Sequence, residues 1–519
     1  MKYSFRNEPS TDFTQPENID AFRRALEATR AELGNAYPLY IGGEKIYTQD
    51  TIDSTNPSNP AEVIGRVSAA TPELASRAVE AAAQAFESWR RVRYDERARY
   101  LFEAARLMRL RKHTFSALMV LEAGKSWIEA DYDTAEAIDF MEFYGREMLR
   151  LGPAQPTIAP PDREVELFYV PLGVGIVIPP WNFPNAILTG LTSATIVAGN
   201  TAVVKPASVT PVIGAWIARL FNDELHLPPG VFNFVPGRGG VVGDTLVEHP
   251  KTRLIVFTGS KEIGLRIFER AAKTQPGQPW LKRTILEMGG KDAIFVDETA
   301  DLDAAAAGIV AAAFGYQGQK CSACSRAIIV ADVYDALLAK IVERTKTIQV
   351  GDPAEGPHVG MGPVIERAAL AKHLEYIVAG KAEGRLAFGG QAIPTATGGY
   401  FLQPTIFADI PPTGRLAQEE IFGPVLSVIK AKDFDDGLAI ANNTEYGLTG
   451  AVYSMRRDRL ERARHEFHAG NLYFNRKCTG ASVGAEPFGG FNMSGTDSKA
   501  GGSDYLLLFT QAKVISEPV

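Results

Sequence analysis

Residues 167–204 read LFYVPLGVGIVIPPWNFPNAILTGLTSATIVAGNTAVV and contain no charged side chain. An uncharged stretch of this length could span a bilayer as a helix. Four prolines and three asparagines interrupt it, however, and in lipid they would leave polar groups without hydrogen-bond partners. We therefore expect buried strands and loops beside a functional site rather than a membrane span.

Short β-rich runs and helical segments alternate around this stretch. The alternation predicts a parallel sheet with helices on its faces, because parallel strands need a crossover between them. A second series of the same kind begins near Asp292 and continues to about Phe488. The sequence therefore predicts an α/β protein with two doubly wound domains. The strands expected in the first series lie at 166–170, 173–178, 201–204, 231–235 and 253–258.

Helical patterns precede this series, and an apolar segment follows the second one. Residues 505–515 are apolar and β-like, so we expect them to pair with another strand, such as one of a second subunit. The four helices expected near the N-terminus lie at 19–33, 71–91, 94–124 and 126–150.

The composition is that of an ordinary globular protein of two or three domains. The 519 residues include 61 acidic and 54 basic side chains, and no long run of Lys or Arg occurs, so nucleic acid is not expected as a partner. Three cysteines are too few for a disulfide framework and favour a reducing compartment. Residues 1–16 lack the apolar core of a secretory signal and the composition of a transit peptide. We expect a cytoplasmic protein without a membrane partner.

A cysteine in Gly318-Gln-Lys-Cys-Ser-Ala-Cys324 is the first candidate for catalysis. Cys321 follows a glycine-flanked turn beside Lys320, which suits an accessible thiolate of lowered pKa. A small buried hydrophobe is the common alternative for a lone cysteine. The Cys-x-x-Cys spacing also permits a redox dithiol, but such motifs usually open a small βαβ domain, whereas this one lies deep in a long chain.

Two other side chains complement the thiol. Glu287, in Leu286-Glu-Met-Gly-Gly-Lys291, could be a general base if it is partly desolvated, or only a solvated acid before a turn. Asn182, in Pro180-Trp-Asn-Phe-Pro184, lies in apolar surroundings, where an amide needs a partner or a purpose. An Asn amide is a suitable hydrogen-bond donor to an oxyanion.

Two glycine clusters are candidates for binding phosphate. Phe257-Thr-Gly-Ser-Lys-Glu-Ile-Gly264 follows an apolar strand and opens a helix, whose N-terminus favours an anion. Gly237-Arg-Gly-Gly-Val-Val-Gly243 is one residue longer than the dinucleotide fingerprint. Tight turns alone explain either cluster equally well. No metal site is expected, because the pair His465 and His468 lacks a third ligand at a suitable spacing.

Taken together, these motifs resemble the NAD(P)-dependent aldehyde dehydrogenase superfamily over about residues 38–515. The N-terminal extension and the segments 37–43 and 471–481 more narrowly resemble its bacterial members that act on L-glutamate 5-semialdehyde. The seven motifs, in chain order, are Pro180-Trp-Asn-Phe-Pro184, Val203-Val-Lys-Pro-Ala207, Phe257-Thr-Gly-Ser260, Glu287-Met-Gly-Gly-Lys291, Gly318-Gln-Lys-Cys-Ser322, Glu419-Glu-Ile-Phe-Gly-Pro424 and Pro487-Phe-Gly-Gly-Phe491.

The resemblance implies a mechanism. Cys321 attacks the aldehyde carbon as a thiolate, and the Asn182 amide and the Cys321 backbone N–H hold the resulting oxyanion. After hydride transfer to the cofactor, Glu287 activates the water that hydrolyses the thioester. The cofactor is NAD, and the residues implied to bind it are Pro180, Trp181, Lys205, Ser208, Gly259, Ser260, Gly264, Glu420 and Phe422.

Two positions depart from the family pattern. Members that use NAD strictly often carry Glu three residues after the lysine that matches Lys205, whereas this chain has Ser208. Without that carboxylate nothing repels a 2′-phosphate, so we expect NADP to be accepted beside NAD. Cys324 stands where a small Ala or Ser is expected, and we interpret it as packing, with a reversible disulfide to Cys321 as the alternative.

For a five-carbon semialdehyde, the narrower resemblance implies a set of substrate contacts. Backbone N–H groups of a loop would bind the far carboxylate, two aromatic rings would line the aliphatic part, and Glu136 would meet the α-amino group. A helix-surface acid is the alternative for Glu136. The implied residues are Glu136, Phe183, Lys320, Ser322, Gly480, Ala481 and Phe488.

The implied activity is oxidation of L-glutamate 5-semialdehyde, formed from 1-pyrroline-5-carboxylate, to L-glutamate in the second step of proline catabolism. The alternatives are another acid-semialdehyde dehydrogenase, such as one for succinate semialdehyde, and a thiol redox protein. A homodimer or larger homo-oligomer is implied, and direct hand-over from a proline dehydrogenase stays open. The implied divisions are a NAD(P)-binding domain at 1–149 and 171–288, a catalytic domain at 289–490, and an oligomerisation segment at 150–170 and 503–519.

Overall fold

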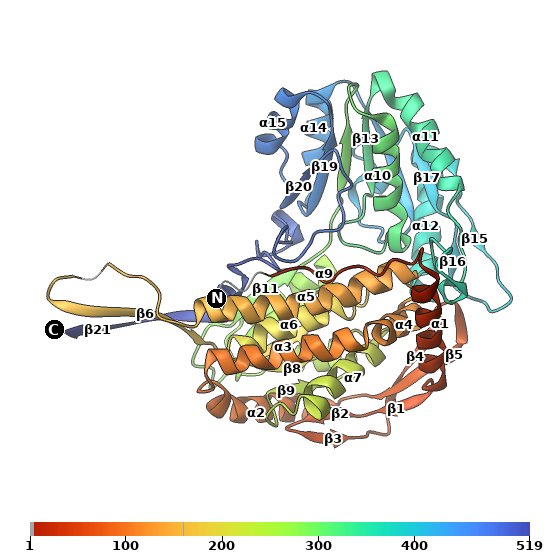
Figure 1. Cartoon of the computed structure of the whole chain (residues 1–519). Coiled ribbons are helices and arrows are strands. Elements are labelled where there is room, and N and C mark those ends of the chain that lie inside the picture. Colours follow the sequence, from red (N-terminus) through yellow and green to blue (C-terminus); the bar gives the residue numbers. More distant parts are fainter. Residues whose placement is uncertain (1–4, 159) are drawn as a thin grey trace.

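The protein is built around two seven-stranded sheets, each covered by helices (Figure 1). The computed structural model describes residues 5–158 and 160–519. Residues 1–4, which belong to the segment examined for a targeting signal, and residue 159, within the predicted oligomerisation segment, lie outside the described residues. The predicted α/β fold with two wound sheets is confirmed.

The first sheet has the strand order β11-β10-β7-β8-β9-β2-β3. Its strands from β11 to β9 run parallel, whereas β2 and β3 add an antiparallel edge. Four of the predicted strands form its centre. The bounds are β2 Leu39–Ile41, β3 Glu44–Ile46, β7 Val174–Ile178, β8 Thr201–Val204, β9 Phe232–Phe234, β10 Thr252–Thr258 and β11 Arg283–Glu287.

Within the uncharged stretch 167–204, β7, the helix Ala186–Val197 (α6) and β8 are buried inside the protein, whereas residues 167–171 end a strand that is only partly buried. Within the described part of the chain, no helix combines the length and the apolarity needed to cross a bilayer. The helices beside the first sheet are α1 Pro16–Ala31, α2 Pro72–Trp89, α3 Tyr94–Leu110, α4 Lys112–Ala123, α5 Trp127–Leu151, α6 Ala186–Val197, α7 Pro211–Arg219, α8 Asp244–Glu248 and α9 Lys261–Ala272.

The prediction of a single helix over 94–124 is wrong, because α3 and α4 are separate helices. Arg111 leaves helical geometry with φ −119°, and its N–H bonds Met108 instead of continuing the helix. Its guanidinium forms an ion pair with Glu224 (2.7 Å).

A three-stranded sheet was not predicted from the sequence. It consists of β1 Asn35–Tyr37, β4 Thr51–Asn56 and β5 Asn59–Ser68.

The second sheet has the order β14-β17-β18-β13-β12-β19-β20 and is parallel except for β14. Its strands are β12 Ala293–Val296, β13 Arg326–Val330, β14 Arg385–Phe388, β17 Thr405–Ala408, β18 Val425–Ala431, β19 Thr449–Tyr453 and β20 Asn471–Phe474, with a small pair of β15 Ala392–Ile393 and β16 Phe401–Leu402. The helices are α10 Leu302–Phe314, α11 Tyr334–Lys346, α12 Arg367–Glu383, α13 Arg415–Gln418, α14 Phe434–Asn442 and α15 Arg457–Glu466.

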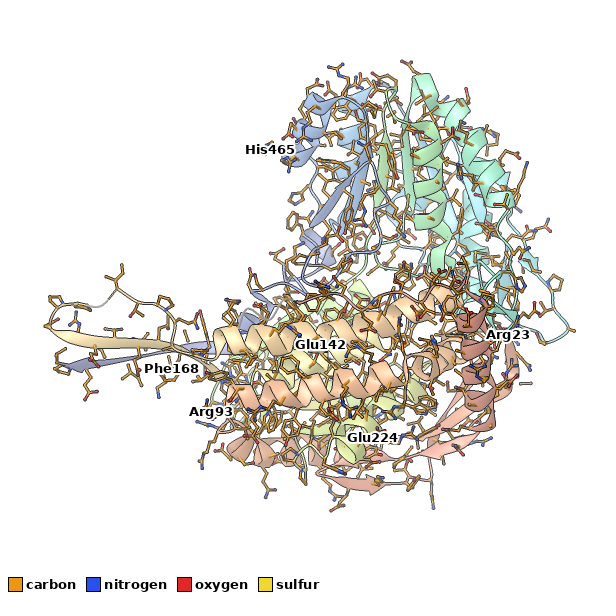
Figure 2. All side chains as sticks on the ribbon, viewed as in Figure 1. Arg23, Arg93, Glu142, Phe168, Glu224 and His465 are labelled. Carbon is orange, nitrogen blue, oxygen red and sulfur yellow. The ribbon has the colours of Figure 1, made fainter. Side chains whose placement is uncertain are left out.

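A two-stranded arm projects from the body of the molecule (Figure 1). It consists of β6 Arg163–Pro171 and β21 Thr510–Pro518, paired antiparallel, and Phe168 lies on it (Figure 2). The strand predicted at 505–515 therefore starts later than expected and pairs within its own chain. Residues 505–509 form a 3₁₀ turn instead, because Tyr505, Leu506 and Phe509 are buried together in the core.

Candidate active site

The predicted site lies where the carboxyl end of the first sheet meets the second sheet. Glu287 is the last residue of β11, and residues 288–292 lead directly into β12. The predicted nucleophile, Cys321, lies in the loop between α10 and β13, and Asn182 lies in the loop after β7. Three predicted residues far apart in sequence therefore come from one junction, as expected for open α/β sheets.

A strained turn positions Cys321. Tyr316, Gln317 and Gly318 all have left-handed backbone conformations, with φ 49°, 56° and 66°. The Gln317 side chain donates to the carbonyls of Gly124 (3.0 Å) and Pro363 (2.7 Å), which holds the turn in place. Strain that neighbouring contacts maintain is typical of functional sites. The turn therefore fixes where the thiol lies.

The electrostatics of Cys321 differ from the sequence-based expectation of a lowered pKa. Its side chain is partly exposed, but burial raises the pKa of its thiol well above the ordinary value. The negative charges of Asp292, Glu420 and Glu287 raise this pKa further. The thiol is therefore neutral near pH 7 and requires a base to become a nucleophile.

Glu287 has the properties of that base. Its side chain is buried, with 6% exposure, which rules out the solvated acid considered above. Burial raises the pKa of Glu287 to about 8, and the Ser498 hydroxyl, which donates to Oε1, opposes that rise. The other carboxylate oxygen, Oε2, is buried without a hydrogen-bond partner among the described residues. Glu287 can thus gain or lose a proton near physiological pH.

Removing the Ser498 hydroxyl tests this balance. In Ser498→Ala the carboxylate loses a donor while its burial stays, so we expect the pKa of Glu287 to rise above about 8. The base is active as the carboxylate, so the rising limb of the kcat profile should move to higher pH. Steady-state rates between pH 6 and 10 measure the shift. A limb that stays in place or moves to lower pH would contradict the assignment.

Asn182 lies directly beside the nucleophile loop. Its amide is buried, with 3% exposure, and donates to the backbone carbonyl of Gln319 (3.0 Å), two residues before Cys321. An amide has two N–H donors, so this contact orients the group and leaves a second donor for an oxyanion.

The residues predicted for the nicotinamide half of the cofactor lie together. Glu420 accepts a hydrogen bond from the Gly290 N–H (3.1 Å), and a Cβ on Gly289 would come within 2.3 Å of its carboxylate. Trp181, next to Pro180, meets Phe422 edge to face with 5.5 Å between ring centroids. A carboxylate and an aromatic wall therefore converge beside the nucleophile loop.

The residues predicted for the adenosine half follow β8 and β10. Lys205 is buried, which lowers its pKa to about 8, and its ammonium contacts the carbonyls of Pro206 (3.1 Å) and Gly237 (3.4 Å). Ser208 is exposed and lines a surface groove of about 510 Å³ that also includes Arg367.

Both residues of the glycine-serine turn before α9 form hydrogen bonds within the protein. The Ser260 hydroxyl accepts the N–H of Ile263 (3.4 Å) and caps α9. The N–H of Gly259 donates to the carbonyl of Glu287 (3.0 Å), so it is not available to a phosphate. Gly264 lies in α9 against Met288, where a Cβ would clash with the sulfur. The helix N-terminus, rather than Gly259, is therefore the feature suited to a pyrophosphate.

A cluster of charged groups lies between α5 and the loop that carries Cys321. Lys320 pairs with Glu129 (2.6 Å), and Lys125 pairs with Asp133 (2.9 Å) with both side chains fully buried. Lys125 also lies 3.8 Å above the ring of Phe183. Sequence reasoning missed Lys125, Glu129 and Asp133, although the spacing of residues 129, 133 and 136 places three acids on one face of α5.

Glu136 is the third acid of that face. Burial and, to a smaller extent, the nearby charge of Asp133 together raise its pKa to about 8. Glu136 is partly buried, which differs from the helix-surface acid considered as the alternative. Its role toward a substrate ammonium group stays a prediction.

The remaining predicted substrate residues are Ser322, which follows Cys321, and three residues that come after β20. Gly480 and Ala481 belong to a loop that Arg476 holds by donating to the Gly480 carbonyl (3.2 Å) and pairing with Glu486 (2.6 Å). Ser322 is buried, and Phe488 pairs with Ala500 in an isolated bridge.

The other two cysteines belong to the interior. Cys324 is 1% exposed, and its thiol contacts the Arg326 carbonyl (3.5 Å), while Cys478 contacts the Ser322 carbonyl (3.4 Å). All three cysteines are free thiols in the structure. The predicted packing role of Cys324 agrees with its burial.

His465 is exposed on α15, at the outer side of the second sheet (Figure 2). No group of three metal-ligating side chains occurs within residues 5–158 and 160–519.

The site as a whole combines a thiol, a base, an amide donor and the contacts that a dinucleotide needs. A buried cation, a carboxylate, a capped helix N-terminus and an aromatic wall fit NAD, whose nicotinamide ring accepts a hydride when it is bound. The geometry thus defines the class of a cysteine-dependent oxidoreductase.

Comparisons with known proteins show which family the chain resembles. Residues 46–515 match the model of the aldehyde dehydrogenase family. A 1-pyrroline-5-carboxylate dehydrogenase of Geobacillus thermodenitrificans is 60% identical over 517 residues, which covers 100% of both chains. The structure of 1-pyrroline-5-carboxylate dehydrogenase from Thermus with bound NAD is 51% identical, with a TM-score of 0.97 and full coverage of both chains. Proline utilization A of Bdellovibrio bacteriovorus is 42% identical, with a TM-score of 0.97, over 100% of this chain and 53% of that one.

This chain belongs to the aldehyde dehydrogenase family. The family predicted from the seven motifs is confirmed, and with it the expectation of an oxidoreductase.

Proposed function

We propose that this protein oxidises L-glutamate 5-semialdehyde, the open form of 1-pyrroline-5-carboxylate, to L-glutamate with NAD. The observation that carries the proposal is the pairing of the Cys321 loop with an anchor for each end of an amino acid. Glu136, whose raised pKa a bound cation would lower, would offer a carboxylate to an α-ammonium group, and the Gly480–Ala481 loop would offer backbone donors to a carboxylate. The names of the 60% identical relative and of the Thermus structure support this substrate.

The chain's own residues would carry the reaction as follows. Glu287 removes the thiol proton of Cys321, whose sulfur forms a bond to the aldehyde carbon, while Asn182 holds the oxyanion. NAD, when bound, would accept the hydride whose loss leaves a thioester on Cys321. Glu287 first gives up the thiol proton to solvent and then removes a proton from water, whose oxygen attacks the thioester carbon. The Cys321 thiolate leaves and takes the proton back from Glu287, and the acid product loses its own proton to solvent.

The test is a substrate comparison on the purified protein. We expect NADH formation, followed at 340 nm, to be strong with 1-pyrroline-5-carboxylate and weak with succinate semialdehyde, because succinate semialdehyde has no α-ammonium group for Glu136 to meet. Turnover of succinate semialdehyde alone would keep the thioester chemistry and exclude the proposed substrate. Absence of NADH with any aldehyde would favour the thiol redox alternative.

The cofactor preference gives a further prediction. Ser208 offers no carboxylate near Lys205, so we expect NADP to be accepted, and Ser208→Glu to raise the KM for NADP at least about fivefold by charge repulsion while the KM for NAD changes little. Initial rates with each cofactor measure this. A wild-type KM for NADP hundreds of times that for NAD would contradict the expectation.

The proposal includes the predicted domain boundaries, a cytoplasmic location, a homodimer and a proline-oxidising supplier of the substrate. The arm of β6 and β21 supports the dimer, because Val514 and Ile515 on it are 61% and 40% exposed. Light scattering of the full chain and of a variant with both residues changed to serine tests whether the arm holds the subunits together.

A further inference from the structure

An extended N-terminal strap, residues 5–14, lies along α5 and has no part in the mechanism above. Two acids of α5 bind it. Asp131 accepts the backbone N–H (2.8 Å) and the hydroxyl (2.6 Å) of Thr11, and Asp139 accepts the backbone N–H of Glu8 (2.6 Å). Glu8 also pairs with Arg109, which reaches Glu142 on α5 (Figure 2). The strap is therefore bound at several points along one helix.

One strap residue also contacts the loop that contains Gly480 and Ala481. The Asn7 amide donates one hydrogen bond to Asp139 Oδ2 (2.8 Å) and another to the backbone carbonyl of Val483 (3.0 Å). Asp139 is three residues after Glu136, about one helical turn, and Val483 is two residues after Ala481. A single side chain thus links the helix that carries one predicted substrate anchor to the loop that carries the other.

Apolar contacts reinforce this link. Phe5 packs edge to face against Phe143 of α5, with 5.2 Å between ring centroids. Both rings lie against Gly484, where a Cβ would come within 3.1 Å of each. The loop therefore meets α5 and the strap at the same place.

We propose that Asn7 is a positioning residue that sets the separation between Glu136 and the Gly480–Ala481 loop, and so determines selectivity for a substrate bearing an α-amino acid group. This inference rests on the proposed function. A substrate held at both ends is sensitive to the distance between its anchors, whereas an aldehyde without polar ends needs only Cys321, Glu287 and Asn182. The residue should therefore affect one kind of substrate and not the other.

The test compares Asn7→Ala with Thr11→Ala, a matched variant that loses a strap contact to α5 but none to the loop. Substrates are 1-pyrroline-5-carboxylate and propanal, a short aldehyde with no amino or carboxylate group. We expect Asn7→Ala to raise the KM for 1-pyrroline-5-carboxylate about fivefold to tenfold and to leave kcat/KM for propanal within twofold. Thr11→Ala should leave both within twofold. Asn7→Asp, of equal size, loses the N–H donors and places a second carboxylate beside Asp139, so it should raise the KM for 1-pyrroline-5-carboxylate at least as much as Asn7→Ala.

Several outcomes separate the alternatives. Equal losses on both substrates in the Asn7 variants would show a general structural role and overturn the inference. So would Asn7 variants that behave like Thr11→Ala on 1-pyrroline-5-carboxylate. Wild-type protein that oxidises propanal but not 1-pyrroline-5-carboxylate would instead overturn the proposed function, and the inference with it. Thermal unfolding of each variant shows whether a loss reflects folding.

Discussion

Cys321→Ala is expected to abolish NADH formation from 1-pyrroline-5-carboxylate and from propanal alike. The alanine side chain cannot form the carbon–sulfur bond on which both oxidation and hydrolysis depend, so kcat should fall by at least about 1,000-fold. The removed group is one small, partly exposed thiol that follows a turn anchored by its own Gln317 side chain to Gly124 and Pro363, so the fold should persist. Absorbance at 340 nm and thermal unfolding measure the two effects separately.

Cys324→Ala is the matched control, since Cys324 lies three residues away and packs in the core of the second sheet. It should keep the activity within a few-fold and lose some stability, because a small cavity replaces the sulfur. Equal loss of activity in both variants would favour the dithiol interpretation instead. Substantial turnover in Cys321→Ala would exclude the thioester route.

The fold was predictable where local pattern and tertiary structure agree. Strands β7 and β8 are buried on both faces, so they read as continuous apolar runs that are easy to recognise. Residues 505–509 are equally apolar, but their burial is achieved by a 3₁₀ turn, which the apolar pattern alone does not distinguish from a strand.

The site was predictable as far as its groups lie in contiguous motifs. Cys321, Glu287 and Asn182 could be found because each stands in a short, chemically suggestive segment. Ser498 could not, since its contact with Glu287 joins residues 211 positions apart. The raised pKa of Cys321 was missed for the same reason, because it depends on burial and on acids contributed by several segments.

Glu287→Gln is the second variant for which we expect a large effect, and it separates the two halves of the reaction. Glutamine keeps the size of the side chain and an oxygen that Ser498 can contact, but it cannot take a proton. Thioester hydrolysis should slow by about 100-fold to 10,000-fold, the range typical of a lost general base. Rapid mixing should show a first phase of about one NADH per active site, slower than in the wild type because the base for the thiol is lost, followed by a still slower steady state, whereas Cys321→Ala should show no such phase.

The pH dependence distinguishes this explanation from a purely structural loss. Because burial raises the pKa of Glu287 to about 8, the carboxylate fraction, and with it the wild-type steady-state rate, should increase as pH rises through 8 and level off above it. Glu287→Gln should lose this limb, since nothing at that position titrates. Because Glu287 is also the proposed base for the Cys321 thiol, the first phase of NADH formation should slow in the variant and recover as pH rises toward the raised pKa of the thiol. A variant that keeps the wild-type limb would assign the titration to another group and leave Glu287 without its role as base.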